Sequence, residues 1–427
     1  MNKTLNFKLD NYHAVGHADI NINGITVIAG INSCGKSTIS RILSYYLTSM
    51  SQFEYHNSYR LINKINVFLS RLLRLGNPSI SSVAREFYIE DRPQFFDIFP
   101  DYIDLFKDRI LDVIILQIAN GSEIQKRRIF SLFGIEYDDN EKINVVIDRV
   151  TSYLARQFDE FSALYDELKD LNERRSISEL KSNIFDNYDI SDEVPSVTLV
   201  EDGLSLLLEE DVFQEPLYFR KAIYIDAALS PTFSNMRRVS SEDYLSYLMT
   251  TEVIKQDQKA NELMLRLGKI INGKIALETS SAHFRSEFRY ISNSGVDIKI
   301  SEAASGIQSL AVIYRLLERG HLDEETLLLI DEPETHLHPQ WVVEYARLLV
   351  LLNKKLNVKL LLASHSPDFV AAVEHFSRIY DLNDNTNYYQ AKYDTDSGKY
   401  NFVSLTDGVA DIFESFNIAM NRISGEE

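Results

Sequence analysis

The sequence is short of the residues that several classes of protein require. It has one cysteine, Cys34, in 427 residues, which excludes an internal disulfide and fits a reducing compartment. No apolar run reaches the roughly 18 residues that a membrane-spanning helix needs. The first residues also lack the basic and apolar regions of a signal peptide. We therefore expect a cytoplasmic protein with no membrane partner.

Positive charge is scarce as well. The chain has 63 acidic and 44 basic residues, which gives a net charge of -19. Indiscriminate binding of nucleic acid needs a positively charged surface, so this balance argues against it. A confined basic patch stays open, and with it nucleic acid as a partner. Arg237 and Arg238 are a candidate phosphate contact, although paired surface arginines are more often ordinary solvated charges.

The clearest pattern that is present is a phosphate-binding loop. An apolar strand predicted over residues 25–29 leads into GINSCGKST, which matches G-x-x-x-x-G-K-[ST], and an apolar-periodic helix follows. A chance glycine-rich turn is the alternative. Such a loop turns its backbone N–H groups toward an anion. The predicted nucleotide-binding residues of this loop are Gly30, Asn32, Ser33, Cys34, Gly35, Lys36, Ser37 and Thr38.

The residue types in the loop indicate its ligands. Lys36 would reach the β and γ phosphates, and the Ser37 hydroxyl would ligate Mg²⁺. We therefore expect ATP and Mg²⁺ as cofactors. Cys34 lies inside the loop, either as a small filler or as a site that is sensitive to oxidants.

Two acidic residues end a second apolar strand. Residues 327–330, LLLI, show no polar alternation, which is typical of a strand buried on both faces of a parallel sheet. Asp331 and Glu332 follow directly, at the end where open α/β sheets bind ligands. Asp331 would hold a metal and Glu332 would activate water. The alternative for such a pair is a helix N-cap.

A third buried strand, predicted over residues 358–363, ends in Ser364-His365. If it is parallel to the strand that bears Asp331, His365 reaches the same crevice and can hydrogen-bond a γ phosphate. His336 and His338 invite a metal site with Glu334. A loop packed against its own motif explains these residues as well, and we do not predict a zinc cage there.

Ser305 and Gly306 open a predicted helix after a hairpin predicted over residues 268–300. Glu302 and the small residues around it leave the helix N-terminus pointing outward, and such an end can bind an anion. The alternative is a plain capping box in which Ser305 serves Gln308.

The stretch over residues 47–217 has no nucleotide motif, and we predict a mainly helical insertion domain there. It would divide the core into residues 1–46 and 218–427. Apolar residues from Ile143 to Leu171 step by three and four, which predicts a helix about 40 Å long. Its bulky aromatic residues favour a helix packed within a helical subdomain over a projecting coiled-coil arm.

Three shorter segments complete the prediction. Residues 186–210 are acidic and carry a proline, which favours irregular structure or a short hairpin. A terminal hairpin is predicted over residues 378–405, and a last helix over residues 410–423.

The motifs, taken in their order along the chain, resemble those of a known class of proteins. The phosphate loop, Ser305-Gly306, Asp331-Glu332 and Ser364-His365 resemble the motifs of ABC-type ATPases of the SMC and RecF superclass. The chain is most similar to ATPases of prokaryotic defence systems, namely the ATPase part of overcoming-lysogenisation-defect nucleases and the Septu and PARIS ATPases. The resemblance covers about residues 1–46 and 218–380. It implies an α/β fold, a P-loop NTPase of ABC-ATPase type with an antiparallel β subdomain and a large helical insertion.

The resemblance also implies a role for each motif. Lys36 and Ser37 bind phosphate and Mg²⁺, Asp331 supports the metal, Glu332 is the general base and His365 is the switch histidine. Ser305 and Gly306, with Gln308, contact ATP that is held by a second subunit. Active sites then exist only in a homodimer or higher oligomer. Ile307 departs from the family, which has a second glycine at this position.

Our leading hypothesis is an ATP-hydrolysing oligomer that controls a separate effector, a nuclease, in anti-phage defence. About 60 residues follow His365, too few for the nuclease domain of the overcoming-lysogenisation-defect proteins. The D-x-D spacing from Asp394 to Asp396 falls in a predicted turn. The alternatives are a nucleotide-gated scaffold with negligible hydrolysis and a DNA-repair clamp similar to RecF, which would need a basic face. A transporter ATPase is disfavoured.

Overall fold

The computed structural model describes residues 3–89, 95–136, 142–188, 190, 193–226, 245, 248–249, 258–280, 285–405, 409–410 and 412–413. Arg237, Arg238 and most of the predicted last helix over residues 410–423 lie outside these residues. The chain divides into two compact units, Met1–Ser51 with Ile177–Glu427, and Gln52–Ser176. We call them the core unit and the helical unit. Within the described part of the chain, no helix is long and apolar enough to cross a membrane.

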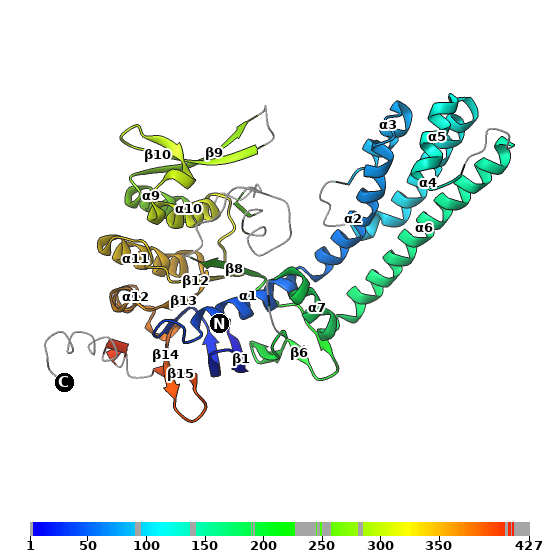
Figure 1. Cartoon of the computed structure of the whole chain (residues 1–427). Coiled ribbons are helices and arrows are strands. Elements are labelled where there is room, and N and C mark those ends of the chain that lie inside the picture. The colour runs from blue at the N-terminus through cyan, green and yellow to red at the C-terminus, as the bar shows by residue number, and fades with distance from the viewer. Residues whose placement is uncertain are drawn as a thin grey trace. The chain divides into compact units, whose positions relative to one another are not determined.

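The helical unit is built from helices that bury one apolar stripe each. It contains α2 (Phe53–Leu73), α3 (Pro78–Glu86), α4 (Phe95–Asn120), α5 (Glu123–Leu132) and α6 (Ile143–Arg174) (Figure 1). The long helix predicted from Ile143 to Leu171 is confirmed by α6. It packs against α2 and α4 and buries Val150, Leu154 and Phe158, which the 3.6-residue period places on one face. The structure therefore favours the packed helix over a projecting arm.

Aromatic rings form the centre of the helical unit. The ring of Phe68 on α2 meets those of Phe106, Phe158 and Phe161 edge-on, with centroid distances of 6.3, 6.4 and 5.7 Å. Edge-to-face contact is the preferred arrangement of aromatic pairs and adds to the gain from burial. These bulky side chains hold the helices in contact along a shared apolar core.

A ten-stranded sheet organises the core unit, in the order β5-β4-β1-β2-β15-β14-β3-β13-β12-β8. β1 and β2 pair antiparallel, as predicted, while β14, β3, β13, β12 and β8 are each parallel to their neighbour. The strands are β1 (Leu5–Tyr12), β2 (Val15–Ile22), β3 (Ile25–Ala29), β4 (Val197–Glu201), β5 (Leu204–Ser205), β8 (Lys221–Asp226), β12 (Thr326–Asp331), β13 (Lys359–Ser364), β14 (Thr386–Asp394) and β15 (Lys399–Leu405).

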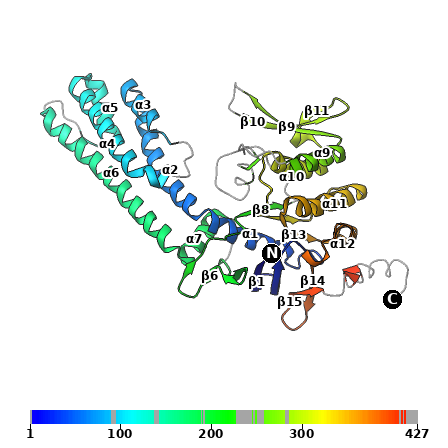
Figure 2. The ribbon, with the colours of Figure 1, turned by 180° about the vertical axis from the view of Figure 1, so that it is seen from behind.

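Helices cover both faces of the parallel half of this sheet. Every residue of β3, β12 and β13 is buried, as their uninterrupted aliphatic sequences predict. Helix α1 (Lys36–Ser51) contacts β8, β12 and β13, and α11 (Pro339–Leu356) contacts β13. Figures 1 and 2 show α1 on one side of these strands and α11, with α12 (Pro367–Ile379), on the other.

The helical unit is shorter than the predicted insertion over residues 47–217. Residues 177–217 lie in the core unit, because α7 (Ile177–Asn187) packs on α1 and β4 pairs antiparallel with β1. A small ribbon of β6 (Leu207–Leu208) and β7 (Val212–Phe213) follows. β4 extends the main sheet beyond β1, and β5 pairs antiparallel with β4 at the sheet edge. The short hairpin, one of the two predicted alternatives for residues 186–210, is therefore confirmed.

A second, three-stranded sheet contains β9 (Gly273–Ser280), β10 (Arg285–Ser292) and β11 (Asp297–Lys299), which confirms the hairpin predicted over residues 268–300. Helices α9 (Gln258–Ile270) and α10 (Ser305–Glu318) contact β9. The predicted terminal hairpin is β14 with β15, although β14 also pairs with β3 and so extends the parallel half of the main sheet.

Candidate functional site

The predicted phosphate loop joins β3 to α1. Ser33 and Gly35 adopt positive φ angles of 65° and 100°, so the chain curls between the strand and the helix. A Cβ atom on Gly35 would lie 2.7 Å from Cγ2 of Val15. Both the backbone conformation and the close approach of the β1–β2 turn therefore require glycine at this position. Asn32 and Ser33 are exposed, so this side of the loop is open to a ligand.

Lys36 lies at the centre of the curled loop. Its ammonium donates to the carbonyl oxygens of Gly30 and Ile31, at 2.9 and 2.8 Å, and the residue is only 4% exposed. Cys34 is buried beside it, and burial raises the pKa of the Cys34 thiol. Because the thiolate is the reactive form, this environment fits a small filler better than a reactive cysteine.

Three loops meet at the carboxyl edge of the parallel strands. Asp331 at the end of β12 is in register with Ala363 of β13, and Ser364 is in register with Ala29 of β3. The N–H of Gly30 also donates to the carbonyl of Ser364, at 3.4 Å. The structure thus brings the phosphate loop, the acidic pair and His365 to one edge, as predicted.

Asp331 is placed as a metal-binding carboxylate would be. Burial raises its pKa, the Ser37 hydroxyl opposes this by hydrogen bonding, and the charges of Asp226 and Glu332 raise it further. Its Oδ1 atom is buried and has no hydrogen-bond partner in the described part of the chain. A carboxylate beside a hydroxyl is the hard oxygen donor set that Mg²⁺ prefers, so these residues fit the metal.

Glu332 leaves the strand in a strained conformation. Its φ of 50° is in the left-handed region, and its N–H donates to the carbonyl of Ala363 at 2.8 Å. Its Oε2 atom accepts a hydrogen bond from the Thr335 hydroxyl at 3.1 Å, and its Oε1 lies 3.5 Å from Nδ1 of His365. Non-glycine residues in this region cost free energy and cluster at functional sites. The turn keeps the Glu332 side chain 31% exposed at the edge of the sheet.

Glu334 was considered from the sequence only as a partner of His336 and His338 in a metal site, and its contact with His365 was not predicted. Its Oε1 atom accepts from the Ser364 hydroxyl and from the His365 N–H, both at 2.9 Å. The same oxygen lies 3.2 Å from Nδ1 of His365, and the Glu334 side chain is only 7% exposed. A second acidic residue two positions after Glu332 was the available signal. Only the packing of its loop on β13 shows that it faces His365.

Ser305 and Gly306 begin helix α10. A Cβ atom on Gly306 would lie 3.0 Å from Cδ2 of Leu337 and 3.1 Å from the carbonyl oxygen of His336, so this helix end packs on the loop after the acidic pair. The capping box is wrong. The N-cap of α10 is Ala304, without a side-chain cap, and the Gln308 amide donates to Ala303 at 2.8 Å.

The two histidines that follow the acidic pair, His336 and His338, have structural roles. His338 is the N-cap of α11, and its Nδ1 accepts from the N–H of Gln340 at 3.3 Å. His336 has a φ of 64° in the turn that meets Gly306. Among the described residues, no group of three or more His, Cys, Asp or Glu side chains is arranged to hold a metal as a cage.

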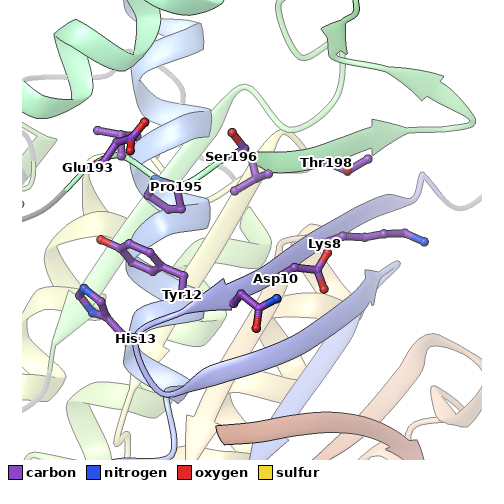
Figure 3. A pocket seen from close by; sticks show the side chains of 11 residues that line it. Lys8, Asp10, Tyr12, His13, Glu193, Pro195, Ser196 and Thr198 are labelled. Atoms are coloured by element: carbon purple, nitrogen blue, oxygen red, sulfur yellow. The ribbon is translucent and has the colours of Figure 1, made fainter. Parts of the chain in front are cut away.

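A cavity of about 640 Å³ opens where β1 and β4 separate. Tyr12 and His13 stack at one end with ring centroids 4.0 Å apart, and Lys8, Asp10 and Thr198 lie along the strands (Figure 3). None of the residues predicted to bind nucleotide lines this cavity. It therefore does not mark the site where the three loops meet.

The chain was compared with known protein families. Residues 25–371 match the family described as AAA domain, putative AbiEii toxin, Type IV TA system. The chain belongs to this family. The match spans the phosphate loop, the acidic pair and His365. With the observed sheet, it confirms the predicted fold, an α/β P-loop ATPase of the ABC type.

Solved structures resemble this family member only distantly. The SMC head domain from Thermotoga maritima has 10% identity and a TM-score of 0.35, over 95% of this chain and 100% of that chain. An Smc head domain from Pyrococcus furiosus, bound to the C-terminal domain of ScpA, has 12% identity and a TM-score of 0.36, over 99% and 100%. MJ1267, an ATP-binding cassette of an ABC transporter, has 11% identity and a TM-score of 0.35, over 96% and 94%. No curated protein matches the chain.

Proposed function

We propose that this protein binds ATP with Mg²⁺ and hydrolyses it. The observation that supports the proposal is the meeting of the phosphate loop, Asp331, Glu332 and His365 at one edge of the sheet. Lys36 would exchange the carbonyl oxygens of Gly30 and Ile31 for phosphate oxygens. Asp331 and Ser37 would hold Mg²⁺, which neutralises charge on the β and γ phosphates when bound.

Glu332 is the general base in this proposal. The Thr335 hydroxyl holds its Oε2 atom, which leaves Oε1 on the side of His365 to take a proton from water. The water oxygen forms a bond to the γ phosphorus while the bond to the β–γ bridging oxygen breaks, and ADP leaves. Glu334 fixes the backbone of His365, so the imidazole can donate to the γ phosphate.

Turnover by purified variants tests this assignment. A general base contributes about 10²- to 10⁴-fold, so Glu332→Gln should lower ATP turnover at least about 100-fold and keep ATP binding. Lys36→Ala should lose binding itself. Glu344→Gln is the matched control and should behave as the wild type, because the Glu344 side chain on α11 is 45% exposed. Turnover that survives in Glu332→Gln would contradict the assignment, and binding without turnover in the wild type would favour the scaffold alternative.

We also propose that two copies complete each other's sites. Ser305 is exposed at the uncapped N-terminus of α10, where backbone N–H groups can face an anion held by another subunit. Trp341 reports on this end of the helix, because its Cε3 atom lies 3.7 Å from the Cβ position of Gly306. Mass in solution should double with ATP and Mg²⁺ in Glu332→Gln, with a change in Trp341 fluorescence. A mass independent of nucleotide would contradict shared sites.

The role in defence is proposed from the family. Its description names a putative toxin of a toxin–antitoxin system, which supports a role in defence. We propose that the ATPase controls a separate effector, a nuclease. The Glu332→Gln form should hold the effector and the Lys36→Ala form should release it. Co-purification with each form, followed by a nuclease assay on the bound fraction, checks this. Equal recovery with both forms would contradict nucleotide control.

A further inference from the structure

The strand beside β12 carries two polar residues that face α1. β8 is parallel to β12, with Tyr224 in register with Leu329 and Asp226 in register with Asp331. Tyr224 and Asp226 lie on the same face of β8, because side chains alternate along a strand. Helix α1, which begins at Lys36, packs on this strand. Asp226 therefore ends its strand directly beside the predicted metal-binding carboxylate.

A chain of hydrogen bonds runs from α1 to Asp331. Arg41 donates from Nη2 to Oδ2 of Asp226 at 2.8 Å and from Nε to the hydroxyl of Tyr224 at 3.1 Å. The Tyr224 hydroxyl then lies 3.4 Å from Oδ2 of Asp331 and donates to it. The guanidinium thus bridges two residues of β8, and one of these contacts the site.

The direction of the hydrogen bonds follows from the donor groups. Arginine has no acceptor, so its N–H occupies a lone pair of the phenol oxygen. A phenol is protonated at neutral pH, and its single proton is then left for Asp331. Oδ2 of Asp331 is engaged in this way, while the buried Oδ1 has no partner among the described residues. The arrangement leaves one defined oxygen of the carboxylate for a cation.

We propose that Tyr224, held by Arg41 and Asp226, is a positioning residue that sets the Mg²⁺ affinity of the site through Asp331. The proposal rests on the proposed binding of ATP with Mg²⁺. Partners that orient a metal-binding carboxylate change metal affinity by about 10- to 100-fold when they are removed. The carboxylate of Asp226 has a different role, since its side chain is 10% exposed and ion-paired with Arg41. Arg41 also balances the negative charge that Asp226 brings next to Asp331.

The test compares Tyr224→Phe with the wild type, because phenylalanine keeps the ring and removes only the hydroxyl. We expect the Mg²⁺ concentration for half-maximal tight binding of a non-hydrolysable ATP analogue to rise about tenfold. Binding of the same analogue without Mg²⁺ should stay within about twofold. Binding of Mn²⁺, followed by its electron paramagnetic resonance, should weaken by the same factor as Mg²⁺ and gives a readout independent of turnover.

Tyr380→Phe is the matched control. The Tyr380 hydroxyl also accepts from an arginine Nε, that of Arg347 at 2.9 Å. Arg347 belongs to α11 and Tyr380 is the C-cap of α12, so this pair does not include a residue of the predicted site. Tyr380→Phe should leave the Mg²⁺ dependence of analogue binding unchanged. Arg41→Lys keeps the charge but cannot bridge Tyr224 and Asp226 with a fixed fork, so it should shift the Mg²⁺ dependence in the same direction by a smaller factor.

Three results would overturn the inference. An unchanged Mg²⁺ dependence in Tyr224→Phe would show that the hydroxyl does not position Asp331. An equal loss of binding with and without Mg²⁺ would show a general structural role, and so would an equal shift in Tyr380→Phe. If the wild type binds the analogue without any effect of Mg²⁺, the proposed metal site fails instead. The Mg²⁺ dependence of binding in the wild type therefore tests the proposed function. The ratio of the half-maximal Mg²⁺ concentration in Tyr224→Phe to that in the wild type tests this inference.

Discussion

The two units of this protein use buried residues differently. The helical unit buries rings and aliphatic chains, with Phe68 at the centre of an aromatic cluster. The core unit also has a large apolar core, but at one edge of its sheet it buries Lys36, Asp331 and Glu334. Burying such groups costs free energy unless they are paired, so their presence together marks a site rather than a packing solution. Apolar packing is thus present in both units, whereas the buried charged groups of the predicted site lie in the core unit.

The largest expected effect is a loss of stability in the helical unit when a residue of its apolar core is truncated. Ile110 on α4 is fully buried, whereas Leu105 on the same helix is 57% exposed. Ile110→Ala should cost about 2–5 kcal/mol in the free energy of unfolding, because it leaves a cavity in the core. Leu105→Ala removes the same number of carbon atoms and should cost well under 1 kcal/mol. Urea unfolding followed by far-ultraviolet circular dichroism measures both.

The single tryptophan makes this experiment specific to one unit. Trp341 belongs to the core unit, so its fluorescence follows the unfolding of that unit alone. If the two units unfold separately, Ile110→Ala should leave the midpoint of the fluorescence transition and the ATP affinity unchanged. A shift of both transitions together would show that the units unfold as one and would remove the distinction drawn above.

A smaller effect concerns the buried histidine of the helical unit. Burial lowers the pKa of His56 on α2 from its ordinary value of 6.5 to about 4. Between these values the unfolded chain binds a proton that the folded chain does not, so stability falls as the pH is lowered from about 6.5 to about 4. From pH 7 to pH 5 the loss should be about 2 kcal/mol.

Variants isolate this contribution. His56→Gln should remove the difference in urea unfolding between pH 7 and pH 5 that is due to this residue. His375→Gln, at an exposed position on α12, should keep it. The same pH dependence in His56→Gln as in the wild type would mean that other groups cause the loss.

The smallest expected effect is a loss of ATP turnover when the buried Glu334 of the core unit loses its charge. Glu334→Gln keeps an oxygen for the Ser364 hydroxyl and the His365 N–H but removes the charge 3.2 Å from Nδ1 of His365. It should lower ATP turnover about tenfold, which is about 1.4 kcal/mol, without changing ATP affinity. Steady-state turnover and calorimetric binding measure the two, with Glu344→Gln again as control. Loss of affinity instead would place Glu334 in nucleotide binding rather than in orienting His365.

Much of the fold follows from local patterns. The aliphatic runs before Gly30, Asp331 and Ser364 predicted buried parallel strands, and the spacing from Ile143 to Leu171 predicted α6. Both patterns arise because backbone geometry repeats every two or 3.6 residues, so a short window of sequence shows which side is buried. The pairing of β4 with β1 was not predicted, because β1 lies nearly 200 residues earlier in the chain.

The candidate site also has a part that follows from local sequence and a part that depends on tertiary structure. The sequence by itself determined the phosphate loop and the acidic pair, because each is a run of adjacent residues whose chemistry depends on spacing along the chain. Only the tertiary structure decided that Glu334 faces His365. It also decided that Arg41 donates to Tyr224, 183 residues away, and that Tyr224 donates to Asp331. These partners are chosen by the order and register of neighbouring strands and by the packing of α1 on them. No local pattern encodes that choice, because it is made between segments that are distant in the chain.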